Sequence, residues 1–290
     1  MKNIAICYSE HAIKVSDSYC SGASNHTTNN TSSSPLSAIP PSIQTAVASI
    51  YKVKLSNEKQ FLIRITWCTP NLAFSITISD HPFSAPKLSR NFKIPRRQRG
   101  SERLHSGGLT ADVLWDLRRA RFGPGPEPVS GFYMAVLVNS ELALTLGDME
   151  HELEEVTKLC VPKKFSLISR GERLSGGGVY AARGRFSEGG AWHDIVIRFR
   201  GGLLSVEVDG KSVIEVKRLQ WNFRGNQSIF LDGLMIDLMW DVHDWMFKPS
   251  SGCAVFLFRT RTGSDSRLWL EDTHFHLAFS FLVFASKNPD

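Results

Sequence analysis

The string Trp240-Asp-Val-His-Asp-Trp245 carries the residue types closest to enzyme chemistry in this chain. Asp241 and His243 are two positions apart, a spacing that places both on one face of a β-strand. A carboxylate beside an imidazole can orient the ring as a general base, which makes the pair a candidate for a hydrolase or lyase. The corresponding position in the first half is Arg118, and the spacing names no third converging group. A structural histidine is the other reading, and the sequence favours a non-enzymatic protein.

A metal site is not predicted. His274 and His276 also share a strand face, but two imidazoles are too few ligands for a structural or catalytic metal. No phosphate-binding loop or dinucleotide fingerprint occurs in the sequence. We therefore predict neither a metal nor another cofactor.

Basic residues gather in one stretch of the first half. They could hold the phosphates of a nucleic acid or of a phosphoinositide headgroup, and the stretch also resembles a nuclear import signal. Phe92 is the only aromatic residue close to them, fewer than single-strand binders use for base stacking. A solvated loop without a partner is the alternative. The anion-binding candidates of this basic loop, residues 87–103, are Arg90, Lys93, Arg96, Arg97, Arg99 and Arg103, preceded by Lys87.

A Trp-Asp pair occurs in both halves of the chain. The stretch from Ala111 to Leu117 recurs as the stretch from Ile236 to Val242, and further matched segments flank both in the same order. Matched segments in a fixed order indicate duplication of one structural unit. On a strand each Trp faces a core, while each Asp can accept backbone hydrogen bonds in a turn. Structural roles are predicted for Trp115, Asp116, Trp240 and Asp241.

The elements that must position these residues are mostly strands. Apolar and polar residues alternate in many short stretches, such as 50–55, 61–67 and 203–208, and this period is typical of β-structure. Asp209-Gly210 is a two-residue hairpin turn. One helix is expected at about 148–160, capped by Asp148. The predicted fold is all-β: an internally duplicated, antiparallel sandwich or barrel-like structure with one short inserted helix.

The chain divides into three parts by composition. Residues 1–42 are polar, small and proline-punctuated, so they cannot bury enough apolar surface to offset chain entropy, and we expect a disordered leader. Residues 43–174 are expected to form the first β repeat with the helix, and residues 175–290 the second. The two repeats can form two domains or one continuous unit.

The composition is that of an ordinary globular protein with a formal charge of +6. Such a charge permits a polyanionic partner without requiring one. The five cysteines are scattered and odd in number, which favours a reducing compartment, the cytoplasm, the nucleus or both. The longest apolar run is about half of what a bilayer crossing needs, so no transmembrane segment is expected.

Several motifs together resemble a known family. They are Leu219-Gln-Trp-Asn-Phe-Arg-Gly-Asn-Gln227, Trp240 to Phe247, Val113 to Phe122, Pro126-Glu-Pro128 and Leu146-Gly-Asp148. In this order they are similar to the plant-specific family of domain of unknown function 868, over roughly residues 43–287. The resemblance implies a plant protein and brings no activity, cofactor or catalytic residue. We expect an intracellular interaction or ligand-binding module, with a possible protein partner or an anionic partner at the basic loop.

Overall fold

The structure, a computed structural model, consists almost entirely of β-strands. It describes residues 42–69, 73–81, 84–93, 98–149, 151–153, 165–187, 189–248, 252–261 and 279–287. The strands of the first half are β1 (Ile43–Lys54), β2 (Gln60–Cys68), β3 (Ala73–Ser79), β4 (Leu88–Lys93), β5 (Arg99–Ser106), β6 (Leu109–Asp116), β7 (Arg121–Phe122), β8 (Pro128–Ser130), β9 (Tyr133–Val138) and β10 (Glu141–Gly147). Those of the second half are β11 (Phe165–Gly176), β12 (Val179–Gly184), β13 (His193–Arg200), β14 (Leu203–Val208), β15 (Lys211–Val216), β16 (Arg224–Leu231), β17 (Leu234–Asp241), β18 (Cys253–Thr260) and β19 (Ser280–Lys287).

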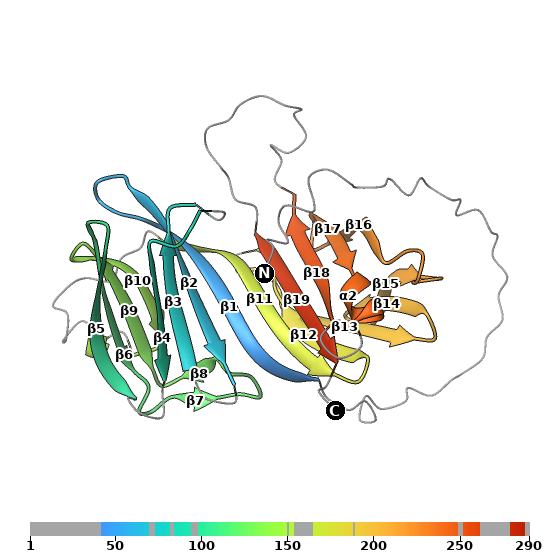
Figure 1. Cartoon of the computed structure of the whole chain (residues 1–290), viewed down its shortest axis with the longest axis horizontal. Coiled ribbons are helices and arrows are strands. Elements are labelled where there is room, and N and C mark those ends of the chain that lie inside the picture. Colours follow the sequence, from blue (N-terminus) through green and yellow to red (C-terminus); the bar gives the residue numbers. More distant parts are fainter. Residues whose placement is uncertain are drawn as a thin grey trace.

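One long sheet runs through both halves of the molecule (Figure 1). Its nine strands lie in the order β16-β17-β18-β19-β11-β1-β2-β3-β4. Two four-stranded sheets, β10-β9-β6-β5 and β12-β13-β14-β15, pack against it, and β7 and β8 form a separate hairpin. All pairings are antiparallel except that of β11 with β19, which is parallel. The predicted all-β sandwich is confirmed.

Both small sheets cover the same face of the long sheet, one at each end. Directly paired residues on neighbouring strands point to the same side. Trp67 pairs with Val47, Val47 with Glu172, and Glu172 with Val283. Trp67 belongs to the core under the first small sheet and Val283 to the core under the second. We call the two sandwiches the first and the second lobe, and this covered side of the long sheet the inner face.

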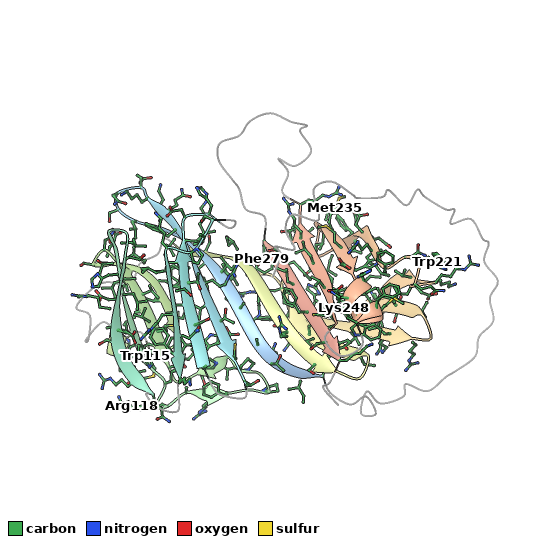
Figure 2. The ribbon with its side chains drawn as sticks, in the orientation of Figure 1. Trp115, Arg118, Trp221, Met235, Lys248 and Phe279 are labelled. Atoms are coloured by element: carbon green, nitrogen blue, oxygen red, sulfur yellow. The ribbon has the colours of Figure 1, made fainter. Side chains whose placement is uncertain are left out.

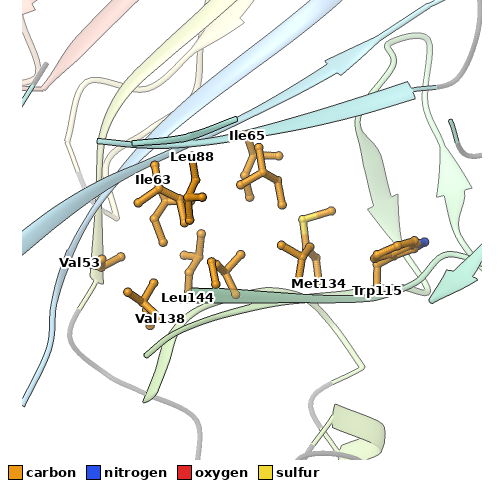
Figure 3. Packing of buried hydrophobic residues seen from close by; sticks show 14 of the residues in the cluster. Val53, Ile63, Ile65, Leu88, Trp115, Met134, Val138 and Leu144 are labelled. Carbon is orange, nitrogen blue, oxygen red and sulfur yellow. The ribbon is translucent and has the colours of Figure 1, made fainter. Parts of the chain in front are cut away.

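Each lobe has its own hydrophobic core. In the first lobe Ile63, Ile65 and Leu88 of the long sheet face Met134 and Leu144 of the small sheet (Figure 3). In the second lobe Phe281 and Val283 of the long sheet face strands β12 to β15. These contacts follow from the period-two pattern, because alternate residues of a strand point to one face and burying them removes apolar surface from water.

The strands of the two lobes follow the same order. The small sheet β10-β9-β6-β5 corresponds to β19-β18-β17-β16 of the long sheet, and β1-β2-β3-β4 corresponds to β12-β13-β14-β15. Trp115 and Trp240 occupy equivalent places on β6 and β17, each paired with a glycine, Gly100 or Gly225. Both indoles are buried. The expected division at 174/175 falls inside β11, which borders both cores.

The expected helix is described only in part. Residues 151–153 are helical, residues 148 and 149 are not, and residues 150 and 154–160 lie outside the described residues. The capping role predicted for Asp148 involves residue 150, which lies outside the described residues. Within the described part, Asp148 Oδ1 accepts hydrogen bonds from the backbone amides of Gly131 (2.7 Å) and Phe132 (3.2 Å). The carboxylate thus secures the entry to β9. A second short helix, α2 (His243–Phe247), follows β17.

Within the part of the chain that the structure describes, no helix is both long and apolar enough to span a bilayer. The expected leader, residues 1–42, lies outside the described residues except for Ser42. The Ser42 hydroxyl accepts a hydrogen bond of 3.0 Å from the amide of Ala181 on β12. This contact places the start of β1 beside the edge of the second small sheet.

Candidate functional site

Asp116 ends β6 and closes the turn that follows it. Its Oδ1 accepts the amide of Arg118 at 3.1 Å, and its Oδ2 accepts Nη2 of the same residue at 2.7 Å. Arg99 Nε lies 3.5 Å from Oδ2. Burial alone would raise the pKa of Asp116, but the hydrogen bonds and charge of Arg118 outweigh it, so the pKa lies below its usual 3.8. The carboxylate is therefore held charged and fully engaged.

Asp241 plays a similar part at the end of β17. Its Oδ1 accepts the amide of His243 at 3.0 Å, and its Oδ2 accepts Arg224 Nε at 2.9 Å. Arg224 pairs with Asp241 across the strands as Arg99 pairs with Asp116. In both lobes the Asp thus joins an arginine of the neighbouring strand to the amide two residues on, as expected of a turn-closing carboxylate.

The Asp241–His243 pair does not have the geometry of a general-base dyad. The expectation that both residues lie on one strand face is wrong, because β17 ends at Asp241 and α2 begins at His243. Asp241 contacts the His243 backbone, while the ring nitrogen Nδ1 lies 3.0 Å from Asp244 Oδ1. The imidazole, about 39% exposed, packs at an angle to the ring of Phe223. The structure does not bring the two candidate side chains together.

Most of the described basic residues of the basic loop are paired with carboxylates. Four of its basic residues form ion pairs: Lys87 with Asp80, Arg90 with Glu102, Arg99 with Asp116 and Arg103 with Asp112. Lys93 is exposed at the end of β4. Arg96 and Arg97 lie outside the described residues. Paired arginines have less charge to offer to a phosphate, because each already faces a carboxylate.

A histidine that the sequence did not single out has the most unusual contacts in the second lobe. His193, the first residue of β13, is about 5% exposed. Its Nδ1 lies 2.7 Å from Asp209 Oδ2, and its Nε2 lies 2.8 Å from Asp232 Oδ2. Both aspartates lie in turns, and each is followed in the chain by a glycine. The Asp209-Gly210 turn is visible in the sequence, but its proximity to His193 and Asp232 depends on the packing of two sheets.

The middle of the inner face is polar. Arg170 of β11 donates to Glu172 at 3.0 Å and pairs at 2.8 Å with Glu127, which precedes β8. Burial raises the pKa of Glu172, and the charge of Arg170 opposes this rise. Burial, followed by the charge of Glu127, raises the pKa of the nearby Tyr51 phenol to about 12. This cluster has a structural role, because Arg170 connects the segment that leads into β8 to β11, the strand that borders both cores.

An exposed edge with aromatic ends distinguishes the second lobe. Strand β16 is the last strand of the long sheet, and most of its residues are exposed. Trp221, just before the strand, is 77% exposed, and Phe230, near its end, is 74% exposed. Met235 pairs with Phe230 across the hairpin and is also exposed. Figure 2 shows Trp221 and Met235 at separate outer points of this lobe, whereas Trp115 lies inside the first lobe.

The comparisons with known proteins agree with the motifs. The chain matches the family described as "Plant protein of unknown function (DUF868)" over residues 42–286. The chain belongs to this family. The match of this DUF868 member to its family includes both lobes. No similar curated protein and no similar solved structure was found.

Potential metal ligands do not converge in the described ranges, which contain no group of three or more His, Cys, Asp or Glu side chains able to hold an ion. His274 and His276 fall between 262 and 278, outside those ranges. Among the described cysteines, Cys68 and Cys253 are free thiols. Burial raises the pKa of both thiols, which keeps them protonated.

Proposed function

We propose that this DUF868 protein is a non-enzymatic interaction module that binds an extended segment of a partner protein along the edge of β16. An edge strand presents backbone N–H and C=O groups to any strand that can pair with it. From Gly225 to Leu231 the strand has no charged residue. Natural edges are usually blocked by lysine, proline or bulges. A seven-residue stretch of edge strand without these features supports a role in strand addition.

The aromatic residues at both ends of β16 carry the proposal. Trp and Phe are enriched in the cores of protein interfaces, and Trp is prominent among the residues that dominate binding energy. Trp221 and Phe230 flank the strand and leave about three quarters of their surface in water. Phe223, two residues after Trp221 in the chain, forms a ring cluster with His243 and Phe247, with centroids 5.0 to 6.2 Å apart. The main chain of β16 would supply the pairing, and these rings would anchor the partner segment.

Site-specific photocrosslinking in plant extract tests this proposal. A photoreactive residue at Phe230 is expected to give a discrete protein adduct, while the same residue at Phe122 of the first lobe should give none. Asn226→Lys, which places a charge on the edge, should abolish the adduct. Asn91→Lys on β4 is the matched control and should leave it intact. Equal adducts at both sites, or an adduct that survives Asn226→Lys, would rule the edge out.

Two other functions receive less support. A hydrolase or lyase built on Asp241 and His243 would need the carboxylate on the ring, and Asp241 is engaged by Arg224 and a backbone amide. Anion binding through Arg90, Arg99 and Arg103 would have to displace the carboxylates of Glu102, Asp116 and Asp112. Binding of duplex DNA by four such contacts would give a slope of log K against log salt of about −3.6.

We also propose that the two lobes arose by duplication, and that the protein works inside the cell. The shared strand order and the equivalent Trp-Asp turns support the first idea. Superposition of β5, β6, β9 and β10 on β16, β17, β18 and β19 tests it, since unmatched Trp115 and Trp240 would refute it. Scattered, odd-numbered cysteines support the second, and imaging of a fluorescent fusion in plant cells would check it.

A further inference from the structure

The contacts of His193 demand a particular protonation state. A carboxylate only accepts hydrogen bonds, and a neutral imidazole has a single N–H to donate. Both ring nitrogens of His193 lie within hydrogen-bond distance of a carboxylate, Asp209 at 2.7 Å and Asp232 at 2.8 Å. The geometry is satisfied only when both nitrogens carry a proton. The ring is therefore an imidazolium between two anions.

The two aspartates come from facing sheets. Asp209 stands in the turn between β14 and β15 of the small sheet, and Asp232 in the turn between β16 and β17 of the long sheet. Each residue has a φ of 50°, in the left-handed region, and is followed by glycine. The Asp194 amide donates to Asp209 Oδ1 at 2.9 Å and orients this carboxylate. One buried ring thus joins the tips of two hairpins that share no backbone pairing.

We propose that His193, Asp209 and Asp232 form a proton-operated latch that holds the β16–β17 turn against the small sheet. Loss of one proton leaves one carboxylate facing a bare ring nitrogen, and both contacts cannot survive. The consequence falls on the hairpin that carries Phe230 and Met235. The latch is a property of the second lobe and does not depend on what binds along β16.

The charges around the ring favour the protonated, closed state. Burial opposes the charged imidazole, but the hydrogen bonds and charges of Asp209 and Asp232 outweigh it, so the pKa of His193 is raised above 6.5. Lys211 on β15 acts on Asp209, and Arg183 on β12 pairs with Asp194 at 3.5 Å. The ring of Phe186 covers the imidazole at 5.7 Å between centroids. The stabilisation that the latch provides is fully present below about pH 6.5 and is lost as the pH rises through the pKa of His193 in the folded protein.

Nuclear magnetic resonance of the full chain can follow the latch directly. The imidazole nitrogens of His193 should titrate with a midpoint above 6.5, and Asp232→Asn should lower this midpoint by about one pH unit. Asp194→Asn is the control, because it removes a charge from β13, the strand of His193, and leaves both carboxylate contacts of the imidazole in place. It should shift the midpoint less. A wild-type midpoint at or below 6.5, or equal effects of both variants, would overturn the proposal.

Hydrogen exchange supplies an independent reading of the turn. The exchange rates are first corrected for intrinsic exchange. The opening equilibrium of the amides in residues 230–235 should then increase by up to about tenfold per pH unit, over the range from the ordinary histidine pKa to the pKa of His193 in the folded protein. In Asp232→Asn this dependence should disappear, and the β5–β6 turn of the first lobe, Gly107-Gly108, should show none in either protein. A flat profile in the wild type would mean that the proton does not control the turn.

Discussion

The far ends of the two lobes are closed by different chemistry. In the first lobe Arg90 of β4 reaches Glu102 of β5 at 2.7 Å, an ion pair between the edges of the two sheets. In the second lobe the equivalent edges are β15 and β16, and Gln227 donates a hydrogen bond of 3.3 Å to the Val213 carbonyl. A charged edge resists pairing with another strand, whereas a neutral edge does not. The same strand order is therefore completed by a charged pair of edge residues in the first lobe and by a neutral hydrogen bond in the second.

The strongest way to test the likeness of the lobes is to remove their buried indoles. Trp115→Ala should lower the free energy of unfolding by about 3–5 kcal/mol, because the indole contacts the rings of Phe74 and Phe92 and leaves a large cavity. Trp240→Ala should cost a similar amount in the second lobe. Urea unfolding followed by circular dichroism measures both. Trp221→Ala, at an exposed site, should change the free energy of unfolding by less than about 0.5 kcal/mol. A larger loss would contradict the exposure of the Trp221 side chain.

Substitution of Gly225, which packs against the Trp240 indole, should give the next largest change in stability. A Cβ at Gly225 would lie 2.2 Å from a ring atom of Trp240, so Gly225→Ala should destabilise the protein by about 1–3 kcal/mol through overpacking. Gly177→Ala is the matched control, because no heavy atom lies within 4 Å of its added Cβ. Thermal unfolding of both variants separates the two outcomes. Equal melting temperatures would show that the indole can move aside.

The two turn-closing aspartates should differ in strength. Asp116 is paired with Arg99 and Arg118 and its side chain is 6% exposed, whereas Asp241 is paired with Arg224 and its side chain is 24% exposed. Asp116→Asn should therefore cost about 1–3 kcal/mol at neutral pH, and Asp241→Asn less. Because the Asp116 pKa is lowered, its contribution is present above 3.8 and is lost as the pH falls through the folded pKa. Urea midpoints of wild type and Asp116→Asn should converge in acid, and a constant difference would be inconsistent with ion pairing.

The smallest effect concerns Tyr51 of β1, beside the polar middle of the inner face. The Tyr51 phenol should ionise near pH 12, against an ordinary value of 10.0. Since the neutral form is favoured in the fold, stability should be steady below 10 and fall as the pH rises from 10 towards 12. Ultraviolet titration of the native protein detects the phenolate, and Tyr51→Phe should remove this late step. An unchanged titration curve in the variant would assign the step to another tyrosine.

Local patterns predicted much of this structure before any tertiary information. The period-two stretches predicted strands, and the Asp209-Gly210 pair predicted a hairpin turn. Both predictions were possible because side-chain alternation and positive φ are properties of a few adjacent residues. Local reasoning failed at His243 and missed one contact of Asp148. His243 begins α2 instead of continuing the strand, and Asp148 binds the amide of Phe132, 16 residues earlier, so neither contact follows from neighbours in the chain.

The sequence by itself determined the all-β class, the family and the burial of Trp115 and Trp240, since each depends on local residue patterns. Only the tertiary structure decided that β1 and β11 join both lobes into one sheet, because strand pairing across more than a hundred residues leaves no mark on local sequence. The same holds for His193, which meets Asp209 and Asp232 across 16 and 39 positions. Such contacts arise when two sheets pack, and their chemistry exists only in the folded chain.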